Sequence, residues 1–364
     1  MHFRYIIAVS LILLCCKTVP AQSGQINYHD VSTLALTGKI VGTPLPFHRF
    51  DTSLYAFSPA VKNLLTHSAG LAVHFSSNSP VIRARWKVSG SKPGANLTPI
   101  MQKGLDLYVK RNGSWQFAGV GRPTADSAIN EAVVVQNLDK TEKEFLLYLP
   151  LYDGTQRLEI GVDASAGFTP LPEAFRKRIL IYGSSIVQGA SASRSGMAYP
   201  AQLSRETGLN FLNLGLSGNA KMEKAAADMV ASIDADAYLL DCVPNSSPDQ
   251  ITERTANLVN TIRQKHPKAP IFVMESIIRQ HGYFDSAVAV NLQKQNQNIA
   301  MEVLKLQKAG MKDLYFIKAD QLLGDDHEGT TDGTHPNDLG FFRMTQGLIK
   351  TLVPILKKYS IYQQ

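Results

Sequence analysis

The second half of the chain alternates short apolar segments with longer segments of helical periodicity, and this alternation restricts the fold more than any other feature. Short runs that are apolar throughout are typical of strands buried on both faces, as in parallel sheets covered by helices. Gly208 and Gly310 lie where helices should end, since glycine readily adopts the left-handed C-cap conformation. The pattern predicts a three-layer α/β/α domain over 176–360 with a flavodoxin-like, five-stranded parallel sheet. The expected strands are 179–182, 211–216, 237–242, 271–275 and 314–317, and the expected helices are 197–207, 220–232, 249–265, 288–309 and 338–358.

The segment 25–170 has a different period and looks all-β. Apolar and polar residues alternate in short runs such as "VIRARWKV", which is typical of antiparallel strands with one face buried. Turn sequences such as "SGSKPG", "RNGS" and "YDGT" separate these runs. We therefore expect a β-sandwich of jelly-roll type before the α/β/α domain. The stretch "TPLPEAFRKR" (169–178), with two prolines, is expected to be a linker between them.

The first 21 residues are typical of an export signal. Arg4 provides a positive start, an apolar core follows from Ile6 to Cys16, and Val19-Pro20-Ala21 offers a cleavage site before Gln22. The apolar core is too short to span a bilayer, so the mature chain is expected to have no transmembrane segment. The alternatives are a buried N-terminal helix, or a lipid anchor on Cys15 or Cys16, although the residues upstream make a poor lipidation sequence.

Cysteine content and charge restrict the function further. Only Cys242 remains after removal of the signal, so no internal disulfide can form. The full chain carries a formal charge of +7, and the mature chain keeps 35 basic and 30 acidic residues. The basic residues are scattered along the sequence, so we expect a solvated surface and no nucleic-acid partner.

Polar residues follow the predicted parallel strands, at the edge of the sheet where α/β proteins bind ligands. Ser184 and Ser185 follow the first strand, "LSGN" the second and Asn245 the third. The segment after the fifth strand contains Asp332-x-x-His335. A serine hydroxyl needs an adjacent base, and an imidazole oriented by an aspartate can take its proton. Backbone N–H groups and an asparagine amide can stabilise an oxyanion. This set of groups suits acyl transfer.

The same residues carry a resemblance to the SGNH/GDSL-type hydrolases. The family's four sequence blocks correspond in order to Gly183-Ser184-Ser185-Ile186, to Gly218 in "GLSGN", to Asn245 in "DCVPN", and to Asp332 with His335. "GLDLYVK" further resembles the subgroup in which a GxDLY β-domain precedes the hydrolase. The resemblance covers almost the whole mature chain.

This resemblance implies an exported serine esterase without a metal or organic cofactor. It implies that Ser185 is the nucleophile, His335 the acid and base, and Asp332 the residue that orients His335. The N–H groups of Ser185 and Gly218 and the side chain of Asn245 would form the oxyanion hole. A carbohydrate ester, such as that of an acetylated glycan, is the expected substrate. The alternatives are a lipid or aryl esterase, and a carbohydrate-binding protein with an inactive hydrolase domain.

Several residues have plainer explanations. Ser184 occupies the position of the family's usual aspartate and is expected to be structural, and Val243 replaces the usual glycine, as in the subgroup. Asp106 and Tyr108 of "GLDLY" are expected to make strand or inter-domain contacts. Arg279 and His281 could line a substrate pocket or lie on the surface. The acidic loop "DDHE" (325–328) lacks a metal-ligand spacing and is expected to be solvated.

Overall fold

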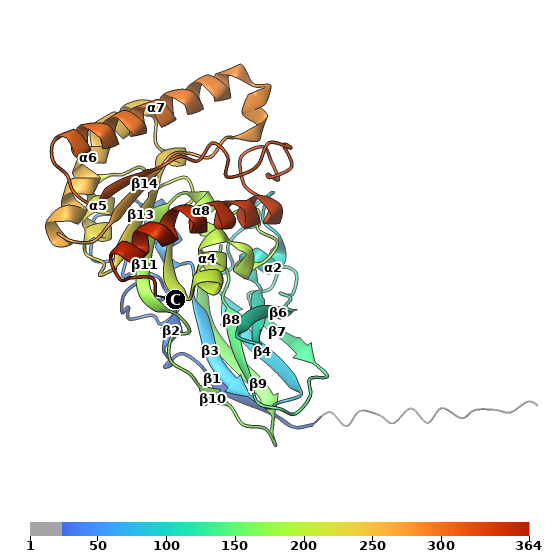
Figure 1. Cartoon of the computed structure of the whole chain (residues 1–364). Helices are drawn as coiled ribbons and strands as arrows, with labels where there is room; N and C mark the ends of the chain where they lie inside the picture. The colour runs from blue at the N-terminus through green and yellow to red at the C-terminus, as the bar shows by residue number, and fades with distance from the viewer. Residues whose placement is uncertain (1–23, 364) are drawn as a thin grey trace, which may run out of the picture.

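The computed structural model describes residues 24–363, which form a β-sandwich domain followed by an α/β/α domain (Figure 1). The predicted export signal, with Cys15 and Cys16, lies outside the described residues. Between residues 24 and 363, the helices are all too short or too polar to cross a membrane.

The β-sandwich consists of two antiparallel sheets, as the alternating pattern predicted. One sheet has the strand order β1-β9-β4-β7; the other has the order β10-β3-β8-β5-β6, with β2 also paired to β3. In β4, Ile82, Ala84 and Trp86 point into the sandwich, while Arg83 and Arg85 point outward. The strands are β1 (Ile26–Asp30), β2 (Leu36–Thr37), β3 (Ala72–Ser77), β4 (Val81–Val88), β5 (Leu105–Arg111), β6 (Ser114–Gly121), β7 (Ile129–Gln136), β8 (Lys143–Tyr148), β9 (Thr155–Asp163) and β10 (Thr169–Pro170).

The all-β expectation for this half was wrong in one respect, because the sandwich also contains two short helices. These are α1 (Pro59–Thr66) and α2 (Pro99–Lys103). Each begins with proline after a capping hydroxyl, from Ser58 and Thr98 respectively. Proline suits the first helical turn, where its missing N–H has no partner to lose. The helices are too short for their periodicity to be recognised from the sequence.

The α/β/α domain contains the predicted five-stranded parallel sheet, in the flavodoxin-like order β12-β11-β13-β14-β15. Its strands are β11 (Arg176–Gly183), β12 (Leu209–Gly215), β13 (Ala237–Asp241), β14 (Ile271–Met274) and β15 (Leu314–Ile317). Its helices are α3 (Ser185–Gln188), α4 (Tyr199–Thr207), α5 (Lys224–Ala231), α6 (Pro248–Lys265), α7 (Ser286–Lys308) and α8 (Asp338–Lys358), with single 3₁₀ turns at Ser195–Met197, Val243–Asn245 and Gln280–Tyr283.

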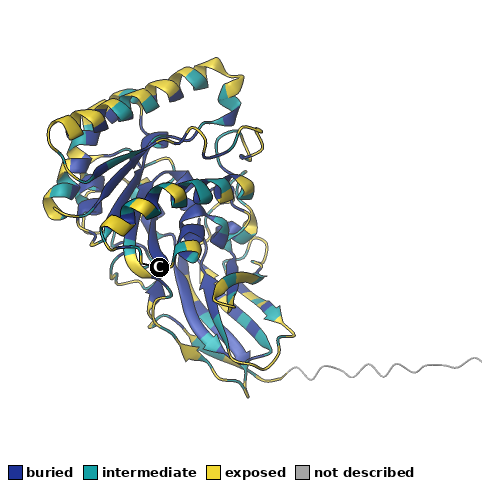
Figure 2. Cartoon of the chain, viewed as in Figure 1, coloured by how far each residue is buried: buried dark blue, intermediate teal, exposed yellow. Residues whose placement is uncertain are grey.

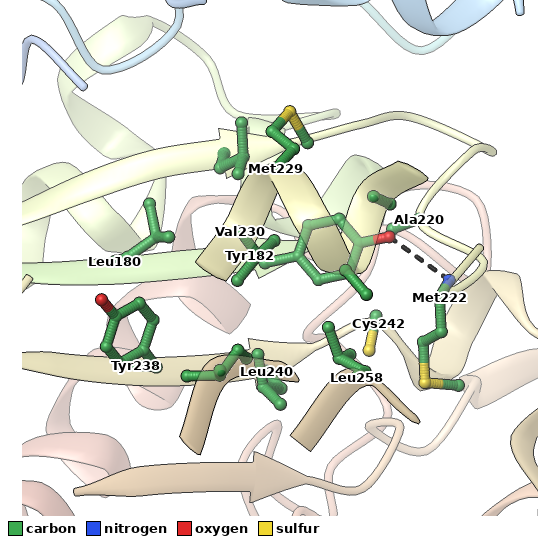
Figure 3. Close-up of a cluster of buried hydrophobic side chains, with 14 of the residues drawn as sticks. Leu180, Tyr182, Ala220, Met222, Met229, Val230, Tyr238, Leu240, Cys242 and Leu258 are labelled. Carbon is green, nitrogen blue, oxygen red and sulfur yellow. Dashed lines mark hydrogen bonds between the residues drawn. The ribbon is translucent and has the colours of Figure 1, made fainter. Parts of the chain in front are cut away.

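Helices cover both faces of this sheet, so its strands are buried throughout (Figure 2). Along β11, Leu180 and Tyr182 pack toward α5, α6 and α7, whereas Ile179 and Ile181 pack toward α4 and α8. Figure 3 shows part of the first cluster, in which the Tyr182 hydroxyl accepts a hydrogen bond from the Met222 N–H at 3.3 Å. Strands that are apolar at nearly every position are the sequence signature of a sheet covered by helices on both faces.

Most predicted boundaries differ from the observed ones by one to three residues, and two differences have a clear physical cause. The helix expected at 220–232 begins only at Lys224, because Met222 has a positive φ of 57° and Ala220 donates its N–H to a side chain. The expected linker is shorter than "TPLPEAFRKR". Its first two residues form the edge strand β10 and its last three begin β11. Proline is tolerated in β10 because an edge strand need not donate on its outer side.

The two domains are joined by buried polar contacts. Asp106 is fully buried; it accepts hydrogen bonds from Arg194 Nη1 at 2.9 and 3.1 Å and from the Gly196 N–H at 2.7 Å. Tyr108 contacts the same Arg194 side chain. Asp106 and Tyr108 of the "GLDLY" sequence therefore make inter-domain contacts, as predicted. A second buried contact comes from Arg49, whose guanidinium donates to the carbonyls of Asn213 and Gly215 at the end of β12, each at 2.9 Å.

Candidate active site

The structure brings Ser185, His335 and Asp332 together at the carboxyl ends of the parallel strands. Ser185 is the first residue of α3, directly after β11, and the other two lie in the loop between β15 and α8. Ser185 Oγ lies 2.9 Å from His335 Nε2, and His335 Nδ1 lies 2.8 Å from Asp332 Oδ2. These distances let Nε2 accept the serine proton while Nδ1 donates to the carboxylate. The neighbouring Ser184 is fully buried and caps α3 by accepting the Ile186 N–H at 3.2 Å.

Asp332 is held in the ionised form that this arrangement requires. Burial opposes ionisation, but hydrogen bonds from the His335 N–H, the His335 imidazole and the Thr334 N–H outweigh it and lower the pKa of Asp332 to about 2. Asp332 is therefore a carboxylate at any pH well above 2. The tight turn that makes this possible passes through Gly333, where a Cβ would lie 2.7 Å from the Cβ of His281. Glycine at 333 thus allows His281 to pack against the loop.

Gly218 and Asn245 follow β12 and β13 at the same edge of the sheet. Gly218 is exposed and has a φ of +69°, and an added Cβ would meet no atom within 4 Å, so its backbone borders open space. Asn245 Oδ1 accepts the Ala220 N–H at 3.3 Å. That contact fixes the side chain and leaves its amide nitrogen as the donor that can serve a ligand.

Sequence reasoning missed Asn96, which comes from the loop between β4 and α2 of the β-sandwich. Its Nδ2 donates to Asp332 Oδ2 at 3.1 Å and lies 3.2 Å from His335 Nδ1. No local pattern marks this residue, because its contacts lie 236 and 239 positions away in the chain.

A buried pair beside the turn that carries Ser185 was also missed. Asp241, the last residue of β13, accepts the Ser184 N–H on its carbonyl at 3.2 Å and the Tyr199 hydroxyl on its carboxyl at 2.9 Å. Burial raises the pKa of Asp241 to about 7, although the bond from Tyr199 opposes the rise. An apolar strand ending in aspartate was visible in the sequence, but its tyrosine partner was not.

Residues near the C-terminal end of the β-sandwich domain contact the turn that carries Ser185. The Tyr152 hydroxyl donates to the Ser185 carbonyl at 3.3 Å. Gln188 donates to the Leu151 carbonyl at 3.0 Å, and its own carbonyl accepts the Ser217 N–H at 3.1 Å. The β-sandwich thus contacts the segment that carries Ser185, and Gln188 of that segment in turn contacts the loop that carries Gly218.

Within residues 24–363, the remaining sequence candidates make no hydrogen bond to Ser185, Asp332 or His335. Arg279 donates to the Pro244 carbonyl at 2.8 Å and lines a cavity of about 520 Å³ beside α7. His281 Nδ1 lies 2.8 Å from the Gly333 carbonyl, next to Asp332. In the loop 325–328, Asp326 forms a bidentate ion pair with Arg343, whose Nη1 and Nη2 donate to the two carboxylate oxygens at 2.6 and 2.8 Å. Across residues 24–363, His, Cys, Asp and Glu form no group of three suited to a metal ion.

Comparison with known proteins identifies the family. The profile of the GDSL-like lipase/acylhydrolase family matches residues 176–353, and the GxDLY profile, the N-terminus of SGNH-hydrolase-type esterases, matches 26–168. A crystal structure described as a GDSL-like lipase from Bacteroides ovatus is 53% identical, with a TM-score of 0.88, over 93% of this chain and 99% of that one. This chain belongs to the GDSL-like lipase/acylhydrolase family. It is accordingly an ester-hydrolysing enzyme.

More distant structures share the fold of this GDSL-like enzyme. A salicylyl-acyltransferase from a tetracycline biosynthetic pathway is 19% identical, with a TM-score of 0.73, over 91% of this chain and 97% of that one. An acetyl xylan esterase from Butyrivibrio proteoclasticus is 11% identical, with a TM-score of 0.58, over 91% and 99% of the two chains. Comparison with the curated proteins gave no match.

Proposed function

We propose that the enzyme hydrolyses carboxylic esters through an acyl-enzyme on Ser185. Ser185 Oγ attacks the ester carbonyl as His335 Nε2 takes its proton. The tetrahedral intermediate then expels the alcohol, which receives that proton from His335. A water molecule, deprotonated in turn by His335, then attacks the acyl-enzyme. The second tetrahedral intermediate releases the acid, and His335 returns the proton to Ser185 Oγ. Asp332 keeps the imidazole in the tautomer and orientation that both halves require.

The oxyanion of each tetrahedral intermediate would be stabilised by three donors: the N–H groups of Ser185 and Gly218 and the amide of Asn245. Ser185 begins α3, so its N–H has no partner within the helix. Donors fixed in place before the reaction stabilise developing charge without reorganising. The contact between Asn245 and the Ala220 N–H supports such a fixed position.

The observation that carries this proposal is the continuous chain of contacts from Ser185 through His335 to Asp332, at 2.9 and 2.8 Å. It also disfavours the alternative of a carbohydrate-binding protein with an inactive hydrolase domain, since such a protein would have no use for an aligned nucleophile and base.

The substrate we propose is an acetyl ester of a carbohydrate. A groove of about 570 Å³ runs beside Asn96, between the β-sandwich loop and the α/β/α domain. Thr98, Ser191, Ser193 and Asp338 line it together with the apolar side chains of Ala95, Leu97 and Leu339. A wall that combines hydroxyl, carboxylate and apolar groups suits a sugar, which has hydroxyl groups on its edges and C–H groups on its faces. The fold shared with an acetyl xylan esterase and with carbohydrate esterases supports the same choice. We further propose, from residues 1–21, that the enzyme acts after export.

The test of the mechanism compares two adjacent serines with p-nitrophenyl acetate as substrate. Ser185→Ala should lower kcat by about 10³-fold or more, because the nucleophile and base act as a unit. Ser184→Ala is the matched control; it removes a helix cap but no reacting group, so its kcat should stay near that of the wild type. Loss of activity in Ser184→Ala with retention in Ser185→Ala would overturn the assignment.

The test of the substrate compares acetylated xylan oligosaccharides with p-nitrophenyl esters of increasing acyl length. The proposal predicts a higher kcat/KM on the acetylated sugar and a decline as the acyl chain lengthens. A preference for long acyl chains would favour the alternative, a lipid or aryl esterase.

A further inference from the structure

The Asp332 carboxylate accepts four hydrogen bonds, and one of them comes from the β-sandwich. Its Oδ1 accepts the backbone N–H groups of Thr334 at 3.0 Å and His335 at 2.8 Å. Its Oδ2 accepts His335 Nδ1–H at 2.8 Å and Asn96 Nδ2 at 3.1 Å. The first three donors belong to the same short loop as Asp332. Asn96 alone ties this carboxylate to the other domain.

Asn96 donates to a carboxylate that is partly open to solvent. The Asp332 side chain is 37% exposed, so water can compete for its oxygens wherever the protein supplies no donor. With Nε2 facing Ser185, the proton of neutral His335 is on Nδ1, so the short Asn96–Nδ1 distance of 3.2 Å is not a second hydrogen bond. It instead reflects two N–H groups that converge on the same oxygen. The amide therefore fixes the oxygen that receives the imidazole N–H.

The loop that carries Asn96 is anchored at several places. Buried Asp153 accepts the Ser91 N–H at 2.8 Å, and buried Gln102 donates to the Lys92 carbonyl at 2.7 Å. Beyond Asn96, the Thr98 hydroxyl donates to the Ser193 carbonyl of the α/β/α domain at 2.7 Å. A group that positions a reacting residue is effective only when its own support is rigid. These contacts provide that support from both domains.

We propose that Asn96 is a positioning residue of the catalytic site, supplied by the β-sandwich domain. It holds Asp332 so that Oδ2 stays aligned with His335 Nδ1 while the imidazole gains and loses its proton. The β-sandwich is in this respect part of the catalytic machinery and not a separate binding module. This inference rests on the proposed function, in which His335 is the base.

The experiment measures kcat, KM and the pH dependence of kcat/KM for p-nitrophenyl acetate, with thermal unfolding as a check on folding. Asn96→Ala should lower kcat about 10-fold, because it removes one hydrogen bond to a charged group. The KM should stay within about twofold of the wild-type value. Asn96→Asp places a second carboxylate beside Asp332 and His335, in a groove that already contains Glu328 and Asp338. The added negative charge favours the imidazolium, so the acid limb should move up by about one pH unit.

Two control variants separate positioning from a general loss of stability. Lys92→Ala changes an exposed side chain of the same loop and should behave like the wild type. Ser79→Ala removes buried hydrogen bonds to the Val81 carbonyl and the Asp163 N–H in the same domain, so it should cost thermal stability while leaving kcat and the pH profile unchanged. If Ser79→Ala lowers kcat as much as Asn96→Ala, or if both Asn96 variants keep the wild-type kcat and pH profile, the inference is wrong.

Ser185→Ala, measured in parallel, separates this inference from the proposed function. An inactive Ser185→Ala together with fully active Asn96 variants would refute only the role of Asn96. An active Ser185→Ala would refute the proposed mechanism, and the role of Asn96 with it.

Discussion

Replacing Asp106 by asparagine should weaken the contact between the two domains, because it removes the buried carboxylate that accepts hydrogen bonds from Arg194 and the Gly196 N–H. Burial raises the pKa of Asp106, and the nearby Arg194 opposes that rise. Removing one partner of a buried ion pair costs about 3–5 kcal/mol of unfolding free energy. The Arg194 side chain is 20% exposed, so water can solvate part of the charge left behind, and we expect the lower end, about 3 kcal/mol.

That loss converts into a measurable change of Tm. A chain of this length has an unfolding entropy of about 0.7 kcal/mol/K, so 3 kcal/mol lowers Tm by about 4 °C if both domains unfold together. Differential scanning calorimetry measures this, with Asp126→Asn as the control, since Asp126 is exposed in the same domain. The double variant with Arg194→Met should recover part of the loss, because the unpaired charge is gone. A Tm within about 1 °C of wild type, or no coupling between the two changes, would refute the reasoning.

Three further predictions follow from the same geometry. Asn245→Ala should lower kcat about 10²- to 10³-fold with little change in KM, and an unchanged kcat would mean that Asn245 only caps its loop. Burial raises the pKa of Asp241 from 3.8 to about 7. Between these two pH values the folded state keeps a proton that the unfolded state has released. The free energy of unfolding should therefore fall by up to about 4 kcal/mol as the pH rises from about 4 to about 7. Asp241→Asn should flatten this slope in urea titrations at a series of pH values; an unchanged slope would assign it to other groups. A chain that starts at Glu173 lacks Arg49, Asn96 and Asp106, and should be insoluble or inactive on p-nitrophenyl acetate; a stable, fully active fragment would contradict the role given to the β-sandwich.

Much of the α/β/α domain was predictable because its signals are local. Strand β15 begins and ends where the apolar run does, and Gly208 ends α4 with a φ of 72°. Ser185, Asp332 and His335 could be placed together because parallel strands end at one edge of the sheet, so three distant segments of the sequence meet there.

What the sequence could not predict depends on contacts between distant segments. Helix α5 starts late because the segment before it contacts Asn245, and no propensity encodes that contact. Asn96 lies in a turn-rich loop that has no catalytic signature, and its importance comes only from the docking of the β-sandwich against the loop of Asp332. Arg49 likewise appears as an ordinary basic residue in the sequence, yet it is fully buried under β12.

The most direct test of the account is the identification of the residue that a serine-directed phosphonate modifies. The enzyme is inactivated with the phosphonate, digested, and analysed by tandem mass spectrometry, with Ser185→Ala treated in parallel. The account predicts one phosphonyl group on Ser185, loss of esterase activity in proportion to labelling, and no labelling of the variant. Modification of Ser184 or another residue, or full ester hydrolysis by a protein labelled at Ser185, would contradict it.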